Sequence, residues 1–190
     1  MARTDRIRNW FGLILTILIL SGCAGVNATP TSVPLNPQPG STGLGDSLYP
    51  YFGNGGYDTL HYTLDITVND VATSDLDAVT TIEATATHDL STFNLDFLGF
   101  EITRLTVNDE AAKFARDGQE LTVTPSKPIP NGTAFTIVVE YSGVPDTLMS
   151  QALPFPTGWI VYENGIFVLS EPDGSATFYP VNDHPLDKAT

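Results

Sequence analysis

The sequence predicts an all-β fold, an antiparallel β-sandwich or curved, saddle-like sheet, over residues 46–190. Apolar and polar residues alternate with a period of two in several segments, and the longest of these covers residues 57–69. Such alternation is typical of strands with one buried face. Turn signals rich in Gly, Asn and Asp separate the segments, and no amphipathic helical pattern lies between them, which favours antiparallel connections.

The expected strands follow from the alternation taken in chain order. Single strands are expected at residues 57–69, 79–88, 93–97, 102–107 and 135–141. Two hairpins are expected, one joining 112–115 to 120–124 around Asp117-Gly118 and one joining 160–162 to 166–169 around Asn164-Gly165, because Asp-Gly and Asn-Gly favour tight turns. A domain of about 145 residues buries roughly 70% of its unfolded surface, which is enough for one core.

The first 22 residues have the pattern of an export signal. Three arginines precede an apolar run at residues 11–20. Ten helical residues cover about half of a ~30 Å hydrocarbon core, so a permanent spanning helix is disfavoured. The run ends in Leu20-Ser21-Gly22-Cys23, which resembles the bacterial lipobox, and Cys23 is the only cysteine in the chain. We therefore predict a lipoprotein signal peptide at 1–22 and lipidation of Cys23; a plain signal peptide with an incidental cysteine is the alternative.

Residues 23–45 are rich in Pro, Ser, Thr, Asn and Gly. Such a segment buries too little apolar surface to order itself, so we predict a solvated tether between the lipid and the domain. Several buried acyl chains bind a membrane durably. The predicted location is therefore extracytoplasmic, on a membrane of the bacterial cell envelope.

The charge balance excludes one class of partner. The chain has 8 Lys+Arg against 22 Asp+Glu, a net charge of −14, which is unsuited to binding nucleic acid. The acidic residues are interpreted as a solvated strand face, since the Asp-rich turns lack the ligand spacing of a calcium loop. His61, His88 and His184 show no metal-ligand spacing, so no metal or other cofactor is expected in this chain.

The adjacent residues Asp183 and His184 could suggest an acid/base pair. Neighbouring residues in sequence rarely orient each other, and no nucleophile motif accompanies them. We predict instead that Asp183 caps the turn that begins at Pro185.

The last twenty residues contain Glu171-Pro172, then Tyr179-Pro180, and end in Lys188-Ala189-Thr190. This series resembles the end of the N-terminal domain of the zinc aminopeptidases of the aminopeptidase N family. Many relatives carry Glu-Pro, then Phe-Pro-Cys-x-Asp-Glu-Pro, then Lys-Ala-Thr. The matching positions here, without gaps, are Glu171-Pro172, Tyr179-Pro180, Asp183, Pro185 and Lys188-Ala189-Thr190. Upstream, residues 57–65 resemble the opening strand of the family, so the resemblance covers about 46–190.

The sequence departs from the family pattern at several places. Many relatives have a Gln shortly before the Glu-Pro and an Ala-Arg pair after it; here Ser170 replaces that Gln, and no Arg lies beside Ala176. Val181 replaces the Cys of the family pattern, and His184 replaces the Glu of its Asp-Glu pair. The sequence Asn-Asp-His-Pro at 182–185 is similar to the one found in a bacterial branch of the family.

The resemblance implies a role for Glu171. In the family the Glu of Glu-Pro helps to bind the free α-amino group of the peptide substrate. A peptide amine has a pKa of about 7.7–8 and is largely cationic at neutral pH, so a carboxylate in a partly dehydrated cleft favours it through a charge-assisted hydrogen bond. Taken without the family, Glu171 is a surface carboxylate at the end of a strand.

The zinc-binding His-Glu-x-x-His helix and the Gly-x-Met-Glu-Asn strand of the family do not occur in these 190 residues. We therefore interpret the chain as truncated before the catalytic domain, with zinc expected in that missing domain and no hydrolysis expected from this chain alone. Whether to class it as an enzyme stays uncertain. The alternative is a free-standing acidic β-domain lipoprotein that acts as an extracytoplasmic binding or scaffold module.

Overall fold

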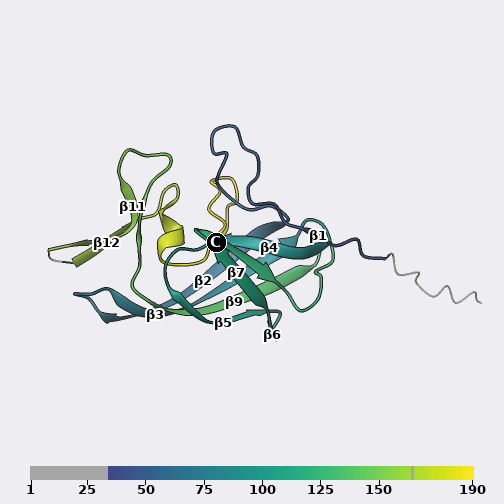
Figure 1. The fold of residues 1–190 in the computed structure, drawn as a ribbon, viewed down its shortest axis with the longest axis horizontal. Helices are drawn as coiled ribbons and strands as arrows, with labels where there is room; N and C mark the ends of the chain where they lie inside the picture. The colour runs from purple at the N-terminus through teal and green to yellow at the C-terminus, as the bar shows by residue number, and fades with distance from the viewer. Residues whose placement is uncertain (1–33, 164) are drawn as a thin grey trace, which may run out of the picture. The chain divides into compact units, whose positions relative to one another are not determined.

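Twelve strands in three sheets carry nearly all of the regular structure of residues 34–163 and 165–190, the part of the chain that the computed structural model describes (Figure 1). The one helical element in this part is the short 3₁₀ turn η1 (Gly174–Thr177). The all-β prediction is therefore confirmed. The predicted signal peptide and Cys23 lie outside the described residues.

The largest sheet has five antiparallel strands in the order β2-β3-β9-β5-β6. Their bounds are β2 (Tyr57–Asp70), β3 (Asp75–Ala86), β9 (Ala134–Gly143), β5 (Glu101–Val107) and β6 (Glu110–Ala111). The register of β2 against β3 shifts between Thr59 and His61, so Leu60 is an extra, bulged residue. Because side chains alternate faces along a strand, one extra residue changes which positions face the core. Thr59 is buried before the bulge, and Tyr62 packs on the core after it.

A second sheet of four strands has the order β1-β4-β8-β7. It consists of β1 (Gln38–Pro39), β4 (Leu90–Asp96), β8 (Glu120–Thr124) and β7 (Lys113–Asp117). The β7–β8 hairpin is the one predicted around Asp117-Gly118, with Asp117 opposite Glu120. The short β1 pairs with β4 in parallel, which is the exception to the expected antiparallel pattern.

The third sheet is a small meander of β10 (Thr147–Met149), β11 (Pro156–Tyr162) and β12 (Gly165–Leu169). The predicted hairpin at residues 160–169 is confirmed, since Val161 lies opposite Ile166. β11 begins four residues earlier than expected because its first residues pair with β10.

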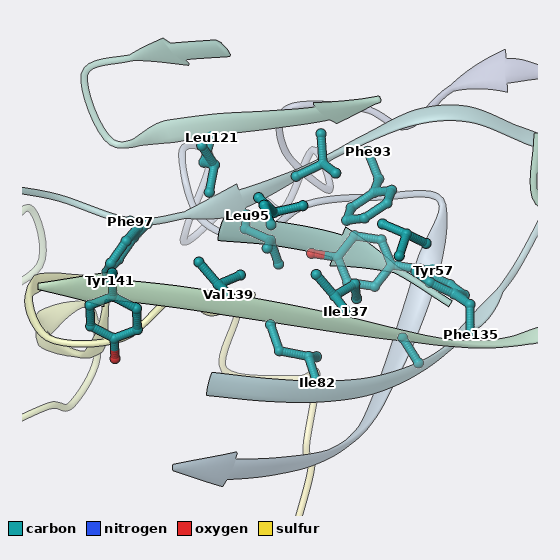
Figure 2. Close-up of a cluster of buried hydrophobic side chains, with 14 of the residues drawn as sticks. Tyr57, Ile82, Phe93, Leu95, Phe97, Leu121, Phe135, Ile137, Val139 and Tyr141 are labelled. Atoms are coloured by element: carbon teal, nitrogen blue, oxygen red, sulfur yellow. The ribbon is translucent and has the colours of Figure 1, made fainter. Parts of the chain in front are cut away.

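The core lies between the five-stranded and the four-stranded sheets. Figure 2 shows Phe93 and Leu95 of β4 and Leu121 of β8 pointing toward side chains of β9 and β3. The ring of Phe93 lies 5.4 Å from that of Phe135 on β9, and the ring of Tyr57 lies 5.7 Å from that of Phe93. The apolar faces that the alternation predicted therefore meet in one core.

Strand β4 differs from the simple alternation because both of its faces are covered. Asn94 and Asp96, which alternate with Phe93 and Leu95, are also buried. A strand whose second face is buried needs partners for its polar side chains, and for Asp96 these come from segments far away in the sequence.

The predicted tether requires a correction over its last part. Residues 38–40 are bound to the domain, because the Gln38 N–H donates to the Asp89 carbonyl and the Gly40 N–H donates to the Thr92 carbonyl, both at 2.8 Å. The amino-acid composition of residues 23–45 did not predict this contact, because the contact is made by backbone groups at the edge of a sheet and not by buried apolar side chains. The part of the tether before residue 34 lies outside the described residues.

A core truncation tests this packing. The Leu95 side chain is fully buried, so we expect Leu95→Ala to lower the free energy of unfolding by about 2–5 kcal/mol. Urea unfolding followed by circular dichroism measures the loss. The matched control is Leu48→Ala at a side chain that is 82% exposed, for which a change within about 0.5 kcal/mol is expected; equal losses would contradict the assignment of the core.

Candidate functional site

Glu171 lies on the turn that follows β12, and its side chain is exposed. Asp173, whose side chain is almost fully buried, holds this turn in place. The Asp173 carboxylate accepts hydrogen bonds from the Thr157 hydroxyl at 3.0 Å and from the Gln151 N–H at 2.9 Å. The Gly174 N–H donates to the Ser170 carbonyl at 2.8 Å. The backbone that carries Glu171 is therefore tied to β11 and to the loop before it.

Glycine is required directly after Asp173. A Cβ atom on Gly174 would lie 2.5 Å from the Gly158 nitrogen on β11, much closer than real Cβ atoms approach other atoms. The turn can therefore pack against β11 only without a side chain at this position. The peptide bond between Glu171 and Pro172 is cis.

Glu171 borders a hollow of about 650 Å³ that is open to solvent. Tyr62 and Leu64 of β2 form one wall, Tyr179 another, and the last residues of the chain a third. The Tyr62 and Tyr179 rings meet edge to face at 5.7 Å. The hollow therefore combines an exposed carboxylate with an aromatic wall, an arrangement that suits a ligand with a cationic group beside an apolar one.

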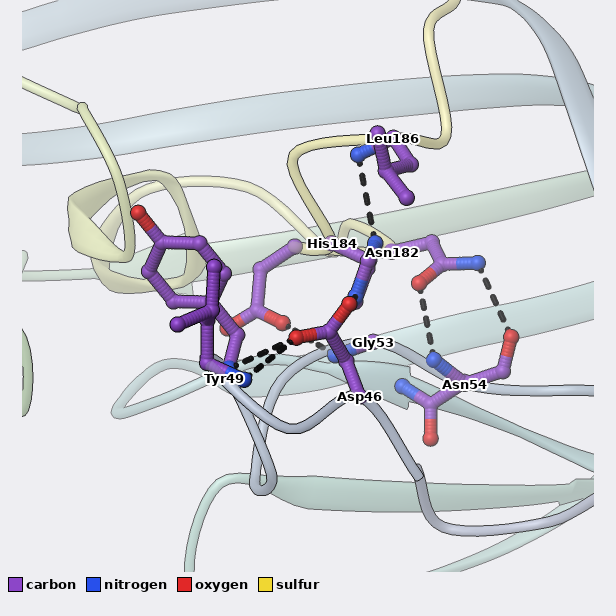
Figure 3. Close-up of polar contacts among 9 residues, drawn as sticks. Asp46, Tyr49, Gly53, Asn54, Asn182, His184 and Leu186 are labelled. Carbon is purple, nitrogen blue, oxygen red and sulfur yellow. Dashed lines mark hydrogen bonds and ion pairs between the residues drawn. The ribbon is translucent and has the colours of Figure 1, made fainter. Parts of the chain in front are cut away.

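The floor near this hollow is formed by Asn182, Asp183 and His184, all of which are buried. The Asn182 side chain pairs with the Asn54 backbone, accepting from its N–H at 2.8 Å and donating to its carbonyl at 3.0 Å (Figure 3). The Gly53 N–H donates to the Asp183 carboxylate at 2.7 Å. These bonds join residues about 130 positions apart in the chain.

The predicted capping role of Asp183 is wrong. Both of its carboxylate oxygens are taken by groups from other parts of the chain, Gly53 and Gln119. The turn at Pro185 is held by His184 instead, because the Leu186 N–H donates to His184 Nδ1 at 3.2 Å and the Asp187 N–H donates to the His184 carbonyl at 3.0 Å. Burial of residues 182–184 overrode the local capping pattern.

Asp96 and Asp183 form a buried acid pair. The Gln119 side-chain amide donates to both carboxyl groups, at 3.0 Å and 2.9 Å, and the Asn54 amide donates to Asp96 at 2.8 Å. Burial, together with the Asp183 charge, raises the pKa of Asp96 well above its usual value. Burial also raises the pKa of Asp183. The pair therefore keeps a proton to higher pH than exposed carboxyl groups do.

His184 makes no acid/base pair with its sequence neighbour. Its Nδ1 accepts from a backbone N–H, so a neutral ring carries its proton on Nε2, which is buried without a hydrogen-bond partner. The nearest acid to Nε2 is Asp46, at 3.9 Å. The Asp46 carboxylate accepts the Tyr49 and Leu48 N–H groups (Figure 3), and these two bonds lower the pKa of Asp46. His184 thus packs beneath the loop at 46–53.

The absence of a side chain at Gly53 allows the loop at 46–53 to lie close to His184. Its φ is +74°, and a Cβ atom there would lie 2.3 Å from the Cβ of His184. The conformation is one that glycine adopts freely and other residues rarely do. Neither the closeness of this loop nor the acid pair was predicted from the sequence, since the only local signal was a polar run at 182–184.

The described residues contain no group of three His, Cys, Asp or Glu side chains that could hold a metal ion. Within residues 34–163 and 165–190, no helix is long and apolar enough to cross a membrane. Cys23, the predicted lipidation site, lies outside this part of the chain.

The solved structures that are similar to this chain include M1 zinc metallopeptidases. The M1 zinc metallopeptidase from Deinococcus radiodurans has 32% identity and a TM-score of 0.68, over 78% of this chain and 34% of that one. A mutant of that metallopeptidase bound to a Tyr-Ser-Ala substrate has 34% identity and a TM-score of 0.69 over the same shares. The fold resembles the N-terminal domain of M1 aminopeptidases.

Aminopeptidase A from Legionella pneumophila, in complex with aspartic acid, shares the fold at 19% identity and a TM-score of 0.55, over 71% of this chain and 15% of that one. No family model matches the sequence, and no curated protein matches it. The chain spans about a third of the length of the M1 zinc metallopeptidases that it resembles.

The acid pair gives the fold a dependence on pH. A carboxyl whose pKa is raised in the folded chain stabilises the fold while it is protonated, and this contribution is lost as the pH rises from about 4 through the raised pKa. We therefore expect the free energy of unfolding to fall as the pH rises from about 4 to 7, and Asp96→Asn to remove much of that fall. Urea unfolding at several pH values measures it.

The control for this measurement is Asp65→Asn, which also removes one carboxylate but at an exposed position on β2. It should leave the slope of stability against pH close to that of the unmodified chain. An Asp96→Asn slope indistinguishable from the control slope would show that the pair does not govern the pH dependence.

Proposed function

We propose that this chain is the non-catalytic N-terminal domain of a membrane-anchored zinc aminopeptidase, and that Glu171 contributes recognition of the free α-amino group of the substrate. The observation that carries the proposal is the exposed carboxylate of Glu171 beside the hollow, on a fold similar to M1 zinc metallopeptidases at 34% identity. The buried Asp173 holds the turn in place without competing for the ligand, since its oxygens are already satisfied.

The chemistry follows from charge and geometry. A carboxylate attracts the cationic amine of an unblocked peptide through a charge-assisted hydrogen bond, which is stronger than a bond between neutral groups. An acylated N-terminus has no positive charge to pair with the carboxylate and cannot form this bond, so blocked peptides bind more weakly. In this way Glu171 restricts cleavage to the first residue of a chain.

Zinc would be held by the catalytic part of the parent enzyme. The described residues supply no group of ligands for it, so this domain contributes substrate positioning and no step at the metal. The metal would supply activated water for attack on the peptide bond. We therefore expect no peptide hydrolysis from this chain alone.

The proposal depends on a longer gene product. Reading the DNA beyond codon 190 tests it, and a continuing frame with a His-Glu-x-x-His motif supports it. A stop codon at that point, with no such motif in a neighbouring frame, would favour the alternative of a free-standing acidic β-domain lipoprotein. That alternative draws on the fact that residues 34–190 form one compact unit with a core of their own.

Substitution of Glu171 tests the recognition role in the full-length parent. Glu171→Gln keeps the shape but removes the charge, and a hydrogen bond to a charged group contributes about 1.5–3 kcal/mol. We expect kcat/KM for unblocked dipeptides to fall about 10- to 100-fold. The control is Glu163→Gln on the exposed turn after β11, which should leave kcat/KM unchanged. Equal turnover by the two variants would refute the role of Glu171.

The membrane anchor is a separate proposal, supported by the lipobox-like sequence that ends in Cys23. We expect Cys23→Ala to abolish metabolic labelling with radioactive palmitate and to release the protein from the membrane fraction of a bacterial host. The matched control is Ser21→Ala, which keeps a small residue at that position. Acyl labelling that persists in Cys23→Ala would contradict lipidation at this residue.

A further inference from the structure

Strand β7 is the last strand of the four-stranded sheet, with β8 on one side only. All five of its residues are exposed. It lies in a different sheet from β2, the strand with which Thr190 pairs. An exposed edge strand presents unpaired N–H and carbonyl groups, so a second strand can add to it where the two sequences fit.

The turn of the β7–β8 hairpin determines which backbone groups of β7 point outward. Asp117 lies opposite Glu120, so two residues form the turn. The first of them, Gly118, has a φ of +60°, which suits a type II′ turn. The residues that flank such a turn form a hydrogen-bonded pair, and hydrogen-bonded pairs alternate along the ladder. Phe114 and Arg116 therefore direct their backbone groups away from β8, and beyond this hairpin no described backbone group bonds to them.

The sequence of β7 is complementary to itself when two copies run in opposite directions. It reads Lys-Phe-Ala-Arg-Asp, centred on Ala115. A second copy that runs antiparallel, with Ala115 opposite Ala115, places Lys113 opposite Asp117 on both sides of the centre. The same alignment places Phe114 opposite Arg116, so the outward backbone groups of the two copies meet as hydrogen-bonded pairs. One register thus satisfies both the charges and the backbone.

The apolar side of this edge is also incompletely covered. Phe114 lies opposite Val123 of β8, whose side chain is fully buried, yet the Phe114 side chain is 45% exposed. The Arg116 guanidinium is held inward, 5.2 Å from the centre of the Phe97 ring, so its apolar stem remains along the strand. In the antiparallel alignment the Phe114 ring of each copy packs on the Arg116 stem of the other.

Charge explains why this strand can accept a second copy. The chain has a net charge of −14, so two copies repel each other over most of their surfaces. Lys113 and Asp117 lie on the solvent face of β7, and neither forms an ion pair with a described residue. A lysine on an edge strand discourages pairing with a general partner, but here an acidic residue lies opposite it.

We propose that β7 is a self-association site, at which two copies of the chain join edge to edge and antiparallel about a two-fold axis between their Ala115 residues. The interface is isologous, because each copy contributes the same strand. It joins the two four-stranded sheets into one continuous sheet. Since one short strand buries little area, we expect a weak dimer. The proposal does not depend on the role of Glu171.

Disulfide trapping tests the register. The central Ala115 pair is of the non-hydrogen-bonded kind, with Cα atoms about 4.5 Å apart, which a disulfide can bridge. We expect Ala115→Cys in the 190-residue chain to give a disulfide-linked dimer after mild oxidation of whole bacterial cells, on a non-reducing gel. The unmodified chain, which also contains Cys23, gives the background.

The matched control is Thr122→Cys, which lies opposite Ala115 on β8. In the proposed dimer the two Thr122 positions are three strand spacings apart, about 14 Å, which is too far for a disulfide. No dimer above background in Ala115→Cys, or an equal amount in Thr122→Cys, would overturn edge pairing. So would a dimer of Ala115→Cys that forms in this chain but not in a full-length parent, because another part of the parent would then cover the edge.

Charge reversal and rescue test the chemistry of the pair. In the Ala115→Cys chain, Lys113→Asp places two acidic residues opposite each other at both ends of the strand, so we expect the dimer to decrease several-fold. Adding Asp117→Lys restores opposite charges in the same register and should restore the dimer. An undiminished dimer in Lys113→Asp, or no recovery in the double variant with an unchanged circular dichroism spectrum, would refute the proposed pairing.

Discussion

The buried acid pair of Asp96 and Asp183 is the interaction on which the rest of the domain depends. Asp96 ends β4 at the edge of the hydrophobic core, and Asp183 belongs to the segment that runs under the hollow. Two carboxyl groups can share such a site only when a proton is retained and donors surround them. Gln119, Asn54 and the Gly53 N–H supply those donors. These buried polar groups form a polar layer that joins β4, the loop at 53–54 and the segment at 181–184, which the apolar core alone would not hold together.

This layer is also what gives the candidate site a firm base. The segment at 181–184 pairs with Asp96 through the Val181 backbone and with the loop at 53–54 through Asn182. The turn of Glu171, which Asp173 holds against β11, lies ten residues before this segment. If Glu171 has the proposed recognition role, this fixed backbone would reduce the conformational entropy that is lost on binding.

Much of the fold could be predicted from the sequence, because a strand with one solvent-exposed face shows alternating apolar and polar residues. The segment 57–69 and the hairpin at Asp117-Gly118 are examples. Asn94 and Asp96 could not be placed, since their polar type at alternate positions is the usual mark of exposure. Asp96 is covered by contacts with Asn54, Val181 and Asp183, which no local sequence pattern connects to it. Glu171 and Asp183 both lie in the motif that resembles the family, whereas no motif marks Asp96, the other member of the acid pair.

The bulge at Leu60 has a consequence for how β2 can change. Before the bulge the odd-numbered residues of β2 face the core, and after it the even-numbered residues do. The single extra residue therefore shifts the core-facing positions of the rest of the strand from odd to even numbers. Deletion of Leu60 would leave Thr59 opposite Ala84 and His61 opposite Glu83 in an unbroken ladder, so the residues from Tyr62 onward would keep their present faces. β2 should therefore tolerate the loss of this one residue, whereas the loss or gain of one residue between Tyr62 and Asp65 would turn Asp65 and Thr67 toward the core and would be as harmful as emptying it.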